Sequence, residues 1–291
     1  MGVITKLTCN EINRLIDDTK IEFISIKETK NGITDSTYIG RDKNHKQYIF
    51  KVFETSTLKE LKNEIHILNT LEHLKVPRVL SSKINLYKNK PTALFSFLEG
   101  KISKEITLKQ IEDITLFLTN IHKIKDIKTT NENIYSKKNI ETLLNTVLVD
   151  KTITNEIKNE FESRYSLIKD ISLDNTSLIH GDLFPDNAKF KDESLSGVYG
   201  FGQSCFGNSY FDLAVLIISW CFKGYELNEI FFNKILDSYN KKMHLSIEKS
   251  FIKQYLLYAS LFYSLQRFTR VNNLKDYKEF LEKFDLIESS F

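Results

Sequence analysis

Apolar and polar residues alternate along much of the first hundred positions, and a period of two predicts β-strands. The expected strands are rich in β-branched and aromatic residues, and the turn sequences "KNGI" and "DKNHK" separate the first three. We expect these strands over "IEFISIKET", "DSTYIGRD", "QYIFKVFE", "RVLSSKINLY" and "PTALFSFLEG". This part of the chain therefore predicts a sheet.

Apolar residues at helical spacing occur twice within the same part and dominate after Gly100. Residues 8–19 are expected to form a helix capped by Thr8. Residues 58–74 predict a second helix, whose apolar face is formed by Leu61, Ile65, Leu68 and Leu71. Beyond Gly100 we expect helices over residues 107–124, 211–223, 228–242, 246–270 and 275–288, with short strand signals at 188–201.

The change of pattern near residue 99 predicts two lobes in an α+β fold. A strand-rich lobe with one main helix would span residues 1–99, and a larger helical lobe would span residues 100–291. The chain shows no internal repeat and no Pro/Gly/Ser-rich linker. A 291-residue chain with 41% hydrophobic residues is long enough to bury a core in each lobe.

Composition excludes several classes of partner. The formal net charge is +3, and no basic stripe is interleaved with aromatics, so nucleic acid is not expected as a partner. The apolar run "LAVLIISWCF" is about half the length needed to span a bilayer. The N-terminal sequence has no apolar signal core, and the three cysteines show no paired spacing. We expect a cytoplasmic protein, monomeric or homodimeric, without membrane contact or a zinc site.

The sequence "HGDLFPDN" carries the main candidate chemistry. Asp182 is followed five residues later by Asn187, and His180 precedes it by two. This spacing is typical of a phosphotransferase loop, in which the aspartate accepts the proton of an attacking hydroxyl and the asparagine binds magnesium. The alternative is a polar turn between two elements. His180 is expected to shape the loop by hydrogen bonding.

Lys51 is the candidate nucleotide-phosphate ligand. It lies in the strand "YIFKVFE" and shares a face with Ile49 and Phe53, so it requires an anionic partner. Glu64, on the helix that follows, is the expected partner, as in kinases where a glutamate holds the phosphate-binding lysine. The alternatives are an exposed strand lysine and a solvated helix glutamate.

Two further segments are candidates for nucleotide contact. "NGITDSTY" lies where a phosphate-covering loop would lie, with Ser36 and Thr37 as hydroxyl donors, although a plain hairpin turn explains it equally well. Ser96, Phe97 and Leu98 are expected to form a hinge whose backbone pairs with an adenine edge. Trp220 could line the acceptor pocket or pack in the core, and His122 is expected to pack at a helix end.

The words "LIHGDLFPDN", "LSGVYGF" and "YFDLA" resemble the aminoglycoside phosphotransferase and choline kinase superfamily. Within that superfamily, "HGDLFPDN", "LSGV", "SC" before "YFDLA", and "SWCF" resemble the bacterial homoserine kinases. The resemblance runs from about Glu28 to the helix at 255–270. It implies a two-lobed, protein-kinase-like fold with an antiparallel N-terminal sheet, ATP and Mg²⁺ as cofactors, and phosphoryl transfer to a hydroxyl of a small molecule.

Two residues acquire an interpretation from the resemblance. Asp212 in "YFDLA" resembles the acid that braces the catalytic loop through backbone hydrogen bonds. Gly200 stands where the superfamily has an aspartate that holds magnesium. Asp186, Asp192 and Glu193 offer no obvious replacement for that carboxylate. The Lys51–Glu64 pair resembles the superfamily in general more than its homoserine kinase branch.

Two functional interpretations follow. The first is an ATP-dependent kinase acting on homoserine, with choline, ethanolamine, an aminoglycoside or a sugar as alternative acceptors, and impaired by Gly200. The second is a kinase-shaped binding protein without turnover. We favour the first, because Asp182 and Lys51 are both retained.

Overall fold

The computed structural model describes residues 4–29, 35–224, 226–271 and 276–290. The chain divides into two compact units. The first contains residues 1–101 together with 189–191 and 196–202, and the second contains residues 102–188, 192–195 and 203–291. Two later segments of the chain, one of which includes Gly200, therefore pack with the N-terminal unit.

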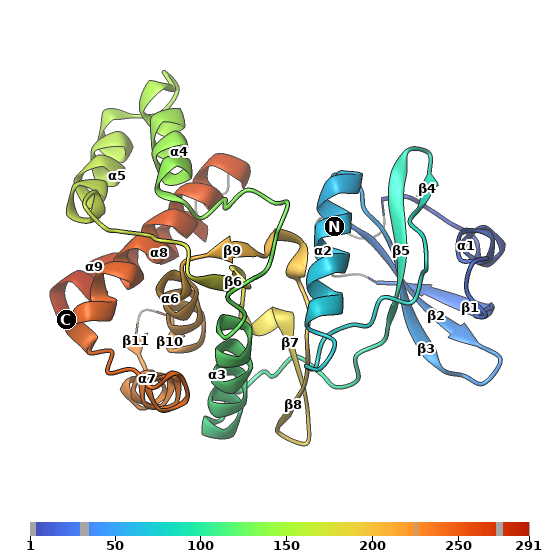
Figure 1. Ribbon diagram of the computed structural model, residues 1–291. Helices are drawn as coiled ribbons and strands as arrows, with labels where there is room; N and C mark the ends of the chain where they lie inside the picture. Colours follow the sequence, from blue (N-terminus) through green and yellow to red (C-terminus); the bar gives the residue numbers. More distant parts are fainter. Residues whose placement is uncertain (1–3, 30–34, 225, 272–275, 291) are drawn as a thin grey trace. The chain divides into compact units, whose positions relative to one another are not determined.

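The N-terminal unit is built on a five-stranded antiparallel sheet (Figure 1). The strand order is β1-β2-β3-β5-β4, and each neighbouring pair runs antiparallel. The strands are β1 (Phe23–Glu28), β2 (Ser36–Asp42), β3 (Gln47–Val52), β4 (Asn85–Tyr87) and β5 (Lys90–Ser96). Only the last three residues of the predicted strand "RVLSSKINLY" form a strand. Earlier in this segment, Val79 forms an isolated bridge with Phe95.

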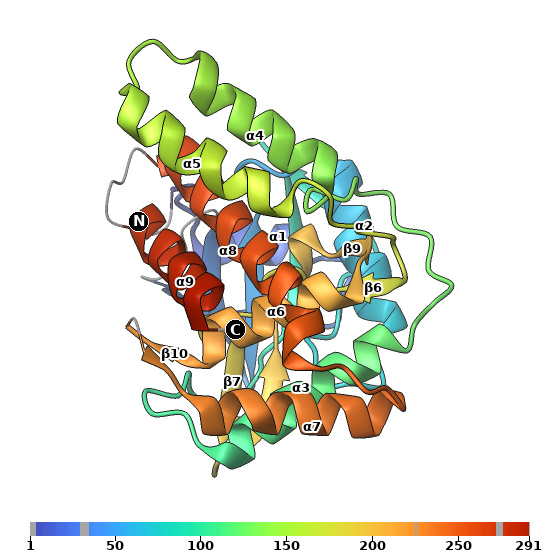
Figure 2. The same ribbon diagram turned by 90° about the vertical axis from the view of Figure 1, so that its left-hand side faces the viewer.

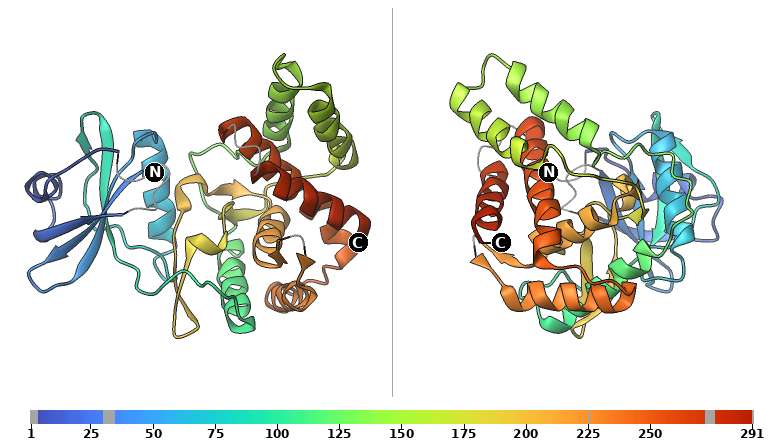
Figure 3. Two further views of the ribbon diagram at one scale, coloured as in Figure 1. Left: turned by 180° about the vertical axis from the view of Figure 1, so that it is seen from behind. Right: turned by 60° about the vertical axis from the view of Figure 1, so that its left-hand side comes forward.

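Helices α1 (Cys9–Leu15) and α2 (Leu58–Thr70) lie on opposite sides of this sheet (Figures 1 and 3). Both begin with a capping box, in which a threonine and a glutamate satisfy each other's backbone N–H groups. On the α1 side, Tyr38, Phe50 and Leu94 stand opposite one another on adjacent strands and are fully buried. Because side chains alternate along a strand, Lys51 points to the other side.

The second unit is mostly helical (Figure 2). Helix α6 (Ser209–Trp220) packs against α3 (Leu108–His122), α7 (Glu229–Met243) and α8 (Lys249–Val271). All its residues except Tyr210 and Ser219 are buried, as the apolar run "LAVLIISWCF" requires. The remaining helices are α4 (Lys137–Val149), α5 (Asn155–Ile168) and α9 (Asp276–Ser290).

Short strands and two single-turn 3₁₀ helices complete the chain. β6 (Ser177–Ile179) pairs with β9 (Cys205–Gly207), β7 (Ala188–Lys191) with β8 (Ser194–Val198), and β10 (Phe222–Lys223) with β11 (Glu226–Leu227). The 3₁₀ helices are Pro185–Asn187 and Phe201–Gln203. In the described ranges no helix combines the length and apolarity that a membrane span requires. The structure has the predicted α+β composition.

A buried carboxylate, Glu54, ties the N-terminal segment to the sheet. Its side chain is 4% exposed and pairs with the ammonium of Lys90. It also accepts hydrogen bonds from the Ser36 hydroxyl and from the Thr5 N–H and hydroxyl. Burial alone would raise the pKa of Glu54, but these donors lower it from its ordinary value of 4.5 to about 2.

We predict that Glu54→Gln destabilises the protein by about 3 kcal/mol at pH 7, the free energy equivalent of this pKa shift. Because the folded-state pKa is depressed, the contribution is fully present above the unfolded-state pKa and is lost as pH falls through about 2. Urea denaturation of both proteins between pH 7 and pH 2 measures the difference, which should shrink below about pH 5.

Glu28→Gln is the matched control, because Glu28 pairs with Lys6 on the surface, where the two side chains are 43% and 69% exposed. It should change the free energy of unfolding by less than about 0.5 kcal/mol. Equal losses in the two variants would contradict the assignment of a buried network to Glu54.

Candidate active site

The loop after β6 holds the predicted catalytic aspartate in a tight conformation. Gly181 has φ +79°, and a Cβ at this position would lie 2.3 Å from the Tyr135 ring, so only glycine fits. The chain then turns through the 3₁₀ helix Pro185–Asn187. This turn brings Asn187 back onto Asp182, where its Nδ2 donates to the Asp182 carbonyl oxygen at 2.7 Å and to Oδ2 at 3.1 Å.

These contacts define what the two residues can do chemically. Because the amide nitrogen of Asn187 faces Asp182, its amide oxygen is the atom left for a cation, the role predicted from the sequence. Burial, followed by the nearby Asp186, raises the pKa of Asp182 to about 6, against the opposing effects of Asn187 and Arg267. A carboxylate of this pKa is mostly ionised at pH 7 and can accept a proton.

The fully buried Asp212 holds the loop from beneath. Its Oδ1 accepts from the Gly181 N–H at 2.8 Å, and its Oδ2 accepts from the His180 N–H at 2.7 Å and from His122 Nε2 at 3.0 Å. Burial would raise the pKa of Asp212, but the hydrogen bond and charge of His122, the charge of His180 and the Gly181 N–H lower it. Asp212 is therefore a buried anion at neutral pH, in the bracing position that the resemblance implied.

His180 takes part in the same hydrogen-bond network, through both its ring and its backbone. Its Nδ1 accepts from the Asp182 N–H at 3.2 Å, and its carbonyl oxygen accepts from the Ser204 hydroxyl at 3.0 Å. The ring is fully buried. The geometry is that of a residue that shapes the loop.

Several residues that support the loop were not predicted from the sequence, or were predicted in another role. His122 is fully buried and contacts the Tyr239 hydroxyl at 2.7 Å as well as Asp212, so it is part of the brace and not merely packed at a helix end. Tyr263 donates its hydroxyl to the Gly181 carbonyl oxygen. Trp220 is 2% exposed and donates to the Leu183 carbonyl oxygen at 2.8 Å, so it belongs to the core and not to a pocket wall.

Lys51 stands on the predicted face of β3, but its partner differs from the prediction. Its Nζ lies 3.0 Å from Asp35 Oδ2 and 4.6 Å from the centre of the Phe53 ring. The predicted direct pair with Glu64 is wrong: within the described part of the chain, the ion pair of Lys51 goes to Asp35. Burial lowers the pKa of Lys51, but Glu64 and Asp35 together raise it above its ordinary value.

Glu64 is buried on α2 and acts on Lys51 through its charge. Burial raises its pKa, although the positive charge of Lys51 opposes this. A Cβ at Gly202 would lie 3.7 Å from Glu64 Oε2, so the segment that contains Gly200 runs close to this carboxylate. Gly200 itself has φ +92°, a conformation that favours glycine.

The predicted hydroxyl donors have different surroundings. Ser36 is fully buried, donates to Glu54 and accepts from the Ile4 and Thr5 N–H groups, each at 2.8 Å, so its prediction as a phosphate ligand is wrong. Thr37 stands opposite Lys51 across β2 and β3 and therefore shares its face. Residues 31–34 of the predicted phosphate-covering loop lie outside the described residues.

Several hydrogen-bonding groups of the predicted hinge already bond to other parts of the protein. The Ser96 N–H donates to the Arg78 carbonyl oxygen at 2.9 Å, and its hydroxyl accepts from the Arg78 N–H at 2.8 Å. Lys189 donates to the Leu98 carbonyl oxygen at 2.9 Å and lies 4.6 Å from the centre of the Phe97 ring. The Ser96 N–H and hydroxyl are therefore already engaged, and the Leu98 carbonyl has one of its two acceptor positions taken.

Metal-binding capacity is limited in the described residues. They contain no group of three or more His, Cys, Asp or Glu side chains arranged around a common point. Asp192 and Glu193 form the exposed turn between β7 and β8 with φ of 50° and 61°. Among the predicted metal-binding positions, Asn187 offers an amide oxygen, and Gly200 offers no side-chain oxygen.

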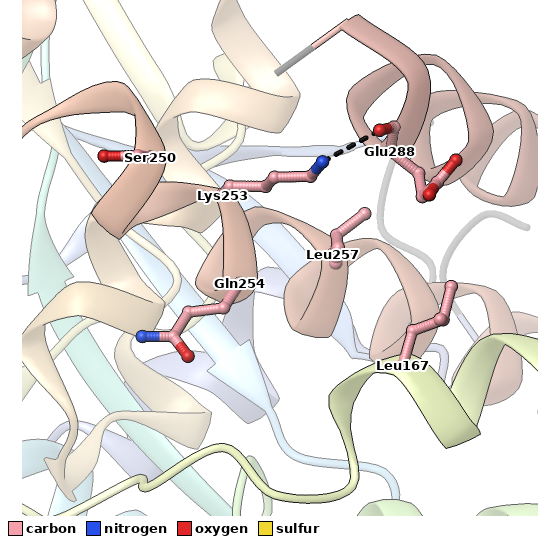
Figure 4. A pocket seen from close by; sticks show the side chains of 6 residues that line it. All are labelled: Leu167, Ser250, Lys253, Gln254, Leu257 and Glu288. Atoms are coloured by element: carbon pink, nitrogen blue, oxygen red, sulfur yellow. Dashed lines mark hydrogen bonds between the residues drawn. The ribbon is translucent and has the colours of Figure 1, made fainter.

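A hollow of about 410 Å³ in the helical unit is separate from these residues (Figure 4). Lys253 crosses it and donates to the Glu288 carbonyl oxygen at 2.8 Å. None of the predicted site residues lines it, so it is not the candidate active site. Its lining consists of Leu167, Ser250, Lys253, Gln254, Leu257 and Glu288.

Sequence comparison relates the chain to known kinases. The phosphotransferase enzyme family matches residues 25–227. A homoserine kinase of Zymomonas mobilis is 27% identical over 241 residues, which cover 76% of this chain and 73% of that kinase. A homoserine kinase of Bartonella tribocorum is 27% identical over 157 residues, covering 52% of this chain and 49% of that kinase.

Solved structures share the fold at low identity. Amicoumacin kinase superposes with a TM-score of 0.67 at 13% identity, covering 93% of this chain and 88% of that chain. The choline kinase LicA of Streptococcus pneumoniae superposes with a TM-score of 0.63 at 20% identity, covering 96% and 97%. The resemblance and the kinase-like fold expected from the sequence are confirmed, and the chain belongs to the phosphotransferase enzyme family.

Proposed function

We propose that this protein transfers the γ-phosphate of ATP to the hydroxyl of L-homoserine. The observation that carries the proposal is the loop from His180 to Asn187, in which a partly buried carboxylate of raised pKa is hydrogen-bonded to an asparagine and the loop is braced by Asp212. The similarity to homoserine kinases supports the choice of acceptor over choline, an aminoglycoside or a sugar.

In this mechanism Asp182 orients the acceptor hydroxyl and accepts its proton. The hydroxyl oxygen forms a bond to the γ-phosphorus while the bond from that phosphorus to the bridging oxygen breaks, and ADP leaves. Lys51 would exchange Asp35 for phosphate oxygens, since its half-buried ammonium already binds an anion there. Magnesium, when bound, would offset the charge on the phosphate oxygens, with Asn187 as its protein ligand.

Gly200 limits the rate in this proposal. The superfamily aspartate at this position would hold the metal against the phosphates, and glycine provides no oxygen ligand from its side chain. Loss of one such stabilising group costs about 3 kcal/mol in the activation barrier. The second candidate function, a nucleotide-binding protein without turnover, is favoured by this one residue.

We predict that Gly200→Asp raises kcat at least about 100-fold, because it supplies the missing carboxylate. Gly200→Asn is the matched control: both side chains carry similar backbone strain at this positive φ, but asparagine brings no charge. Coupled ADP-release assays with ATP, Mg²⁺ and L-homoserine measure the difference. Equal rates in the two variants would show that no carboxylate is required at this position.

An acceptor screen on the Gly200→Asp form separates the two functions. Turnover with L-homoserine and little with choline, ethanolamine, an aminoglycoside or a sugar is the expected result. Failure to consume ATP with every acceptor would favour the binding protein without turnover.

We predict that Asp182→Asn lowers kcat in the Gly200→Asp form by about 10²–10⁴-fold and leaves the Kd for ATP nearly unchanged. In the parent form, kcat/KM should fall with decreasing pH below about 6, because the base becomes protonated. Stopped assays across pH 4.5–8, combined with calorimetric titration of ATP, measure both. A parallel loss of ATP binding would show that Asp182 has a different role.

A further inference from the structure

Three aromatic rings form a platform directly beside the catalytic loop. Phe184, two residues after Asp182, lies 5.0 Å from Tyr263 on α8 and 6.2 Å from Phe280 on α9, measured between ring centres. Tyr263 and Phe280 stack at 5.6 Å. Because Tyr263 also donates its hydroxyl to the Gly181 carbonyl oxygen, the platform is fixed to the loop.

Arg267 lies over this platform. Its guanidinium carbon is 4.3 Å from the centre of the Phe280 ring and 5.8 Å from that of Phe184. The side chain is partly exposed, and it forms no ion pair with a carboxylate among the residues whose side chains the structure describes. A guanidinium stacked on an aromatic face keeps its N–H edge available for a planar anion.

The charges around Arg267 favour an anionic ligand. Lys283, which contacts the same Phe280 ring, is 5% exposed, pairs with Glu279 at 2.7 Å and lies 4.8 Å from the Phe280 ring centre. Burial lowers the pKa of Lys283, and the charge of Arg267 lowers it further. Glu279 is therefore committed to Lys283 and leaves the charge of Arg267 uncompensated among the described side chains.

The position of Arg267 relative to the proton acceptor is also informative. Its guanidinium carbon lies 5.8 Å from the centre of the Phe184 ring, and Phe184 follows Asp182 by two residues in the same loop. A bound molecule could contact both groups, with a neutral hydroxyl at Asp182 and a negative group at Arg267. Choline, ethanolamine, aminoglycosides and neutral sugars lack such a negative group, whereas amino acids have one.

We propose that Arg267 binds the carboxylate of an amino-acid acceptor and thereby selects hydroxy amino acids over amino alcohols. This inference rests on the proposed function, because it concerns the acceptor of the same reaction. The stacked guanidinium donates two N–H groups to the carboxylate, and the acceptor hydroxyl then lies at Asp182. Arg267 is in this sense the specificity-determining residue of the site.

A pair of acceptors that differ only in the carboxylate tests the inference. 3-Amino-1-propanol has the hydroxyl and the amine of L-homoserine without its carboxylate. In the Gly200→Asp form, Arg267→Gln should lower kcat/KM for L-homoserine about 100-fold, in line with the loss of a buried charge-assisted pair. The value for 3-amino-1-propanol and the Kd for ATP should change less than about threefold.

Two further variants control for structural damage. Arg267→Lys keeps the charge but loses the planar fork, so it should give an intermediate loss for L-homoserine and none for the amino alcohol. Arg164→Gln removes an arginine that already pairs with Asp285 at 2.6 Å in the same unit, and it should leave the preference unchanged. Thermal melting confirms that each variant is folded.

Binding measurements keep the inference separate from the proposed reaction. Calorimetric titration of the unaltered chain, saturated with ADP and Mg²⁺, should show L-homoserine binding that Arg267→Gln weakens about 100-fold. If ATP is never consumed but this difference is observed, the proposed reaction fails and the carboxylate site stands. Absence of L-homoserine binding to the unaltered chain would overturn the carboxylate site.

Three other outcomes would overturn the role of Arg267. One is an equal loss for both acceptors in Arg267→Gln. Another is a matching loss of ATP affinity, which would place Arg267 at the nucleotide phosphates. The third is a loss of the preference in Arg270→Gln and not in Arg267→Gln, which would assign the carboxylate to the neighbouring arginine.

Discussion

The buried carboxylate of Asp212 is the constraint on which the candidate catalytic loop depends. A fully buried anion is tolerated only if its oxygens receive hydrogen bonds, and here His122 and the backbone of His180 and Gly181 provide them. The same bonds fix two consecutive peptide groups immediately before Asp182. The position of the candidate catalytic carboxylate is therefore set by a second, fully buried carboxylate.

The contact within this loop joins residues close in sequence and could be predicted. The brace beneath the loop joins residues far apart in sequence and could not. Asp182 and Asn187 are brought together by one turn of chain, so their contact follows from five residues of sequence. His122 and Tyr239 lie 90 and 27 residues from Asp212, and the brace exists only after α3, α6 and α7 have packed. The polar helices α4 and α5 were missed for a related reason, since few of their residues are buried.

The N-terminal unit shows a second limit of sequence reasoning. The alternation of apolar residues places Lys51 on the correct face and requires an acidic partner, but it does not identify which acid lies nearest. Asp35 comes from the chain just before β2 and reaches Lys51 because Thr37 pairs with Lys51 across the sheet. Ser36, one position earlier, points to the opposite face, where Glu54 takes its hydroxyl.

Gly200 illustrates how fold and rate can separate. At φ +92° an aspartate would carry backbone strain that glycine does not. An aspartate at position 200 would therefore lower the stability of the fold relative to glycine. Neither the Asp212 brace nor the aromatic platform under Arg267 includes position 200. A change from aspartate to glycine would therefore relieve strain without altering either of these two arrangements. In the proposed reaction, the step most sensitive to this change is the one in which charge develops on the phosphate oxygens.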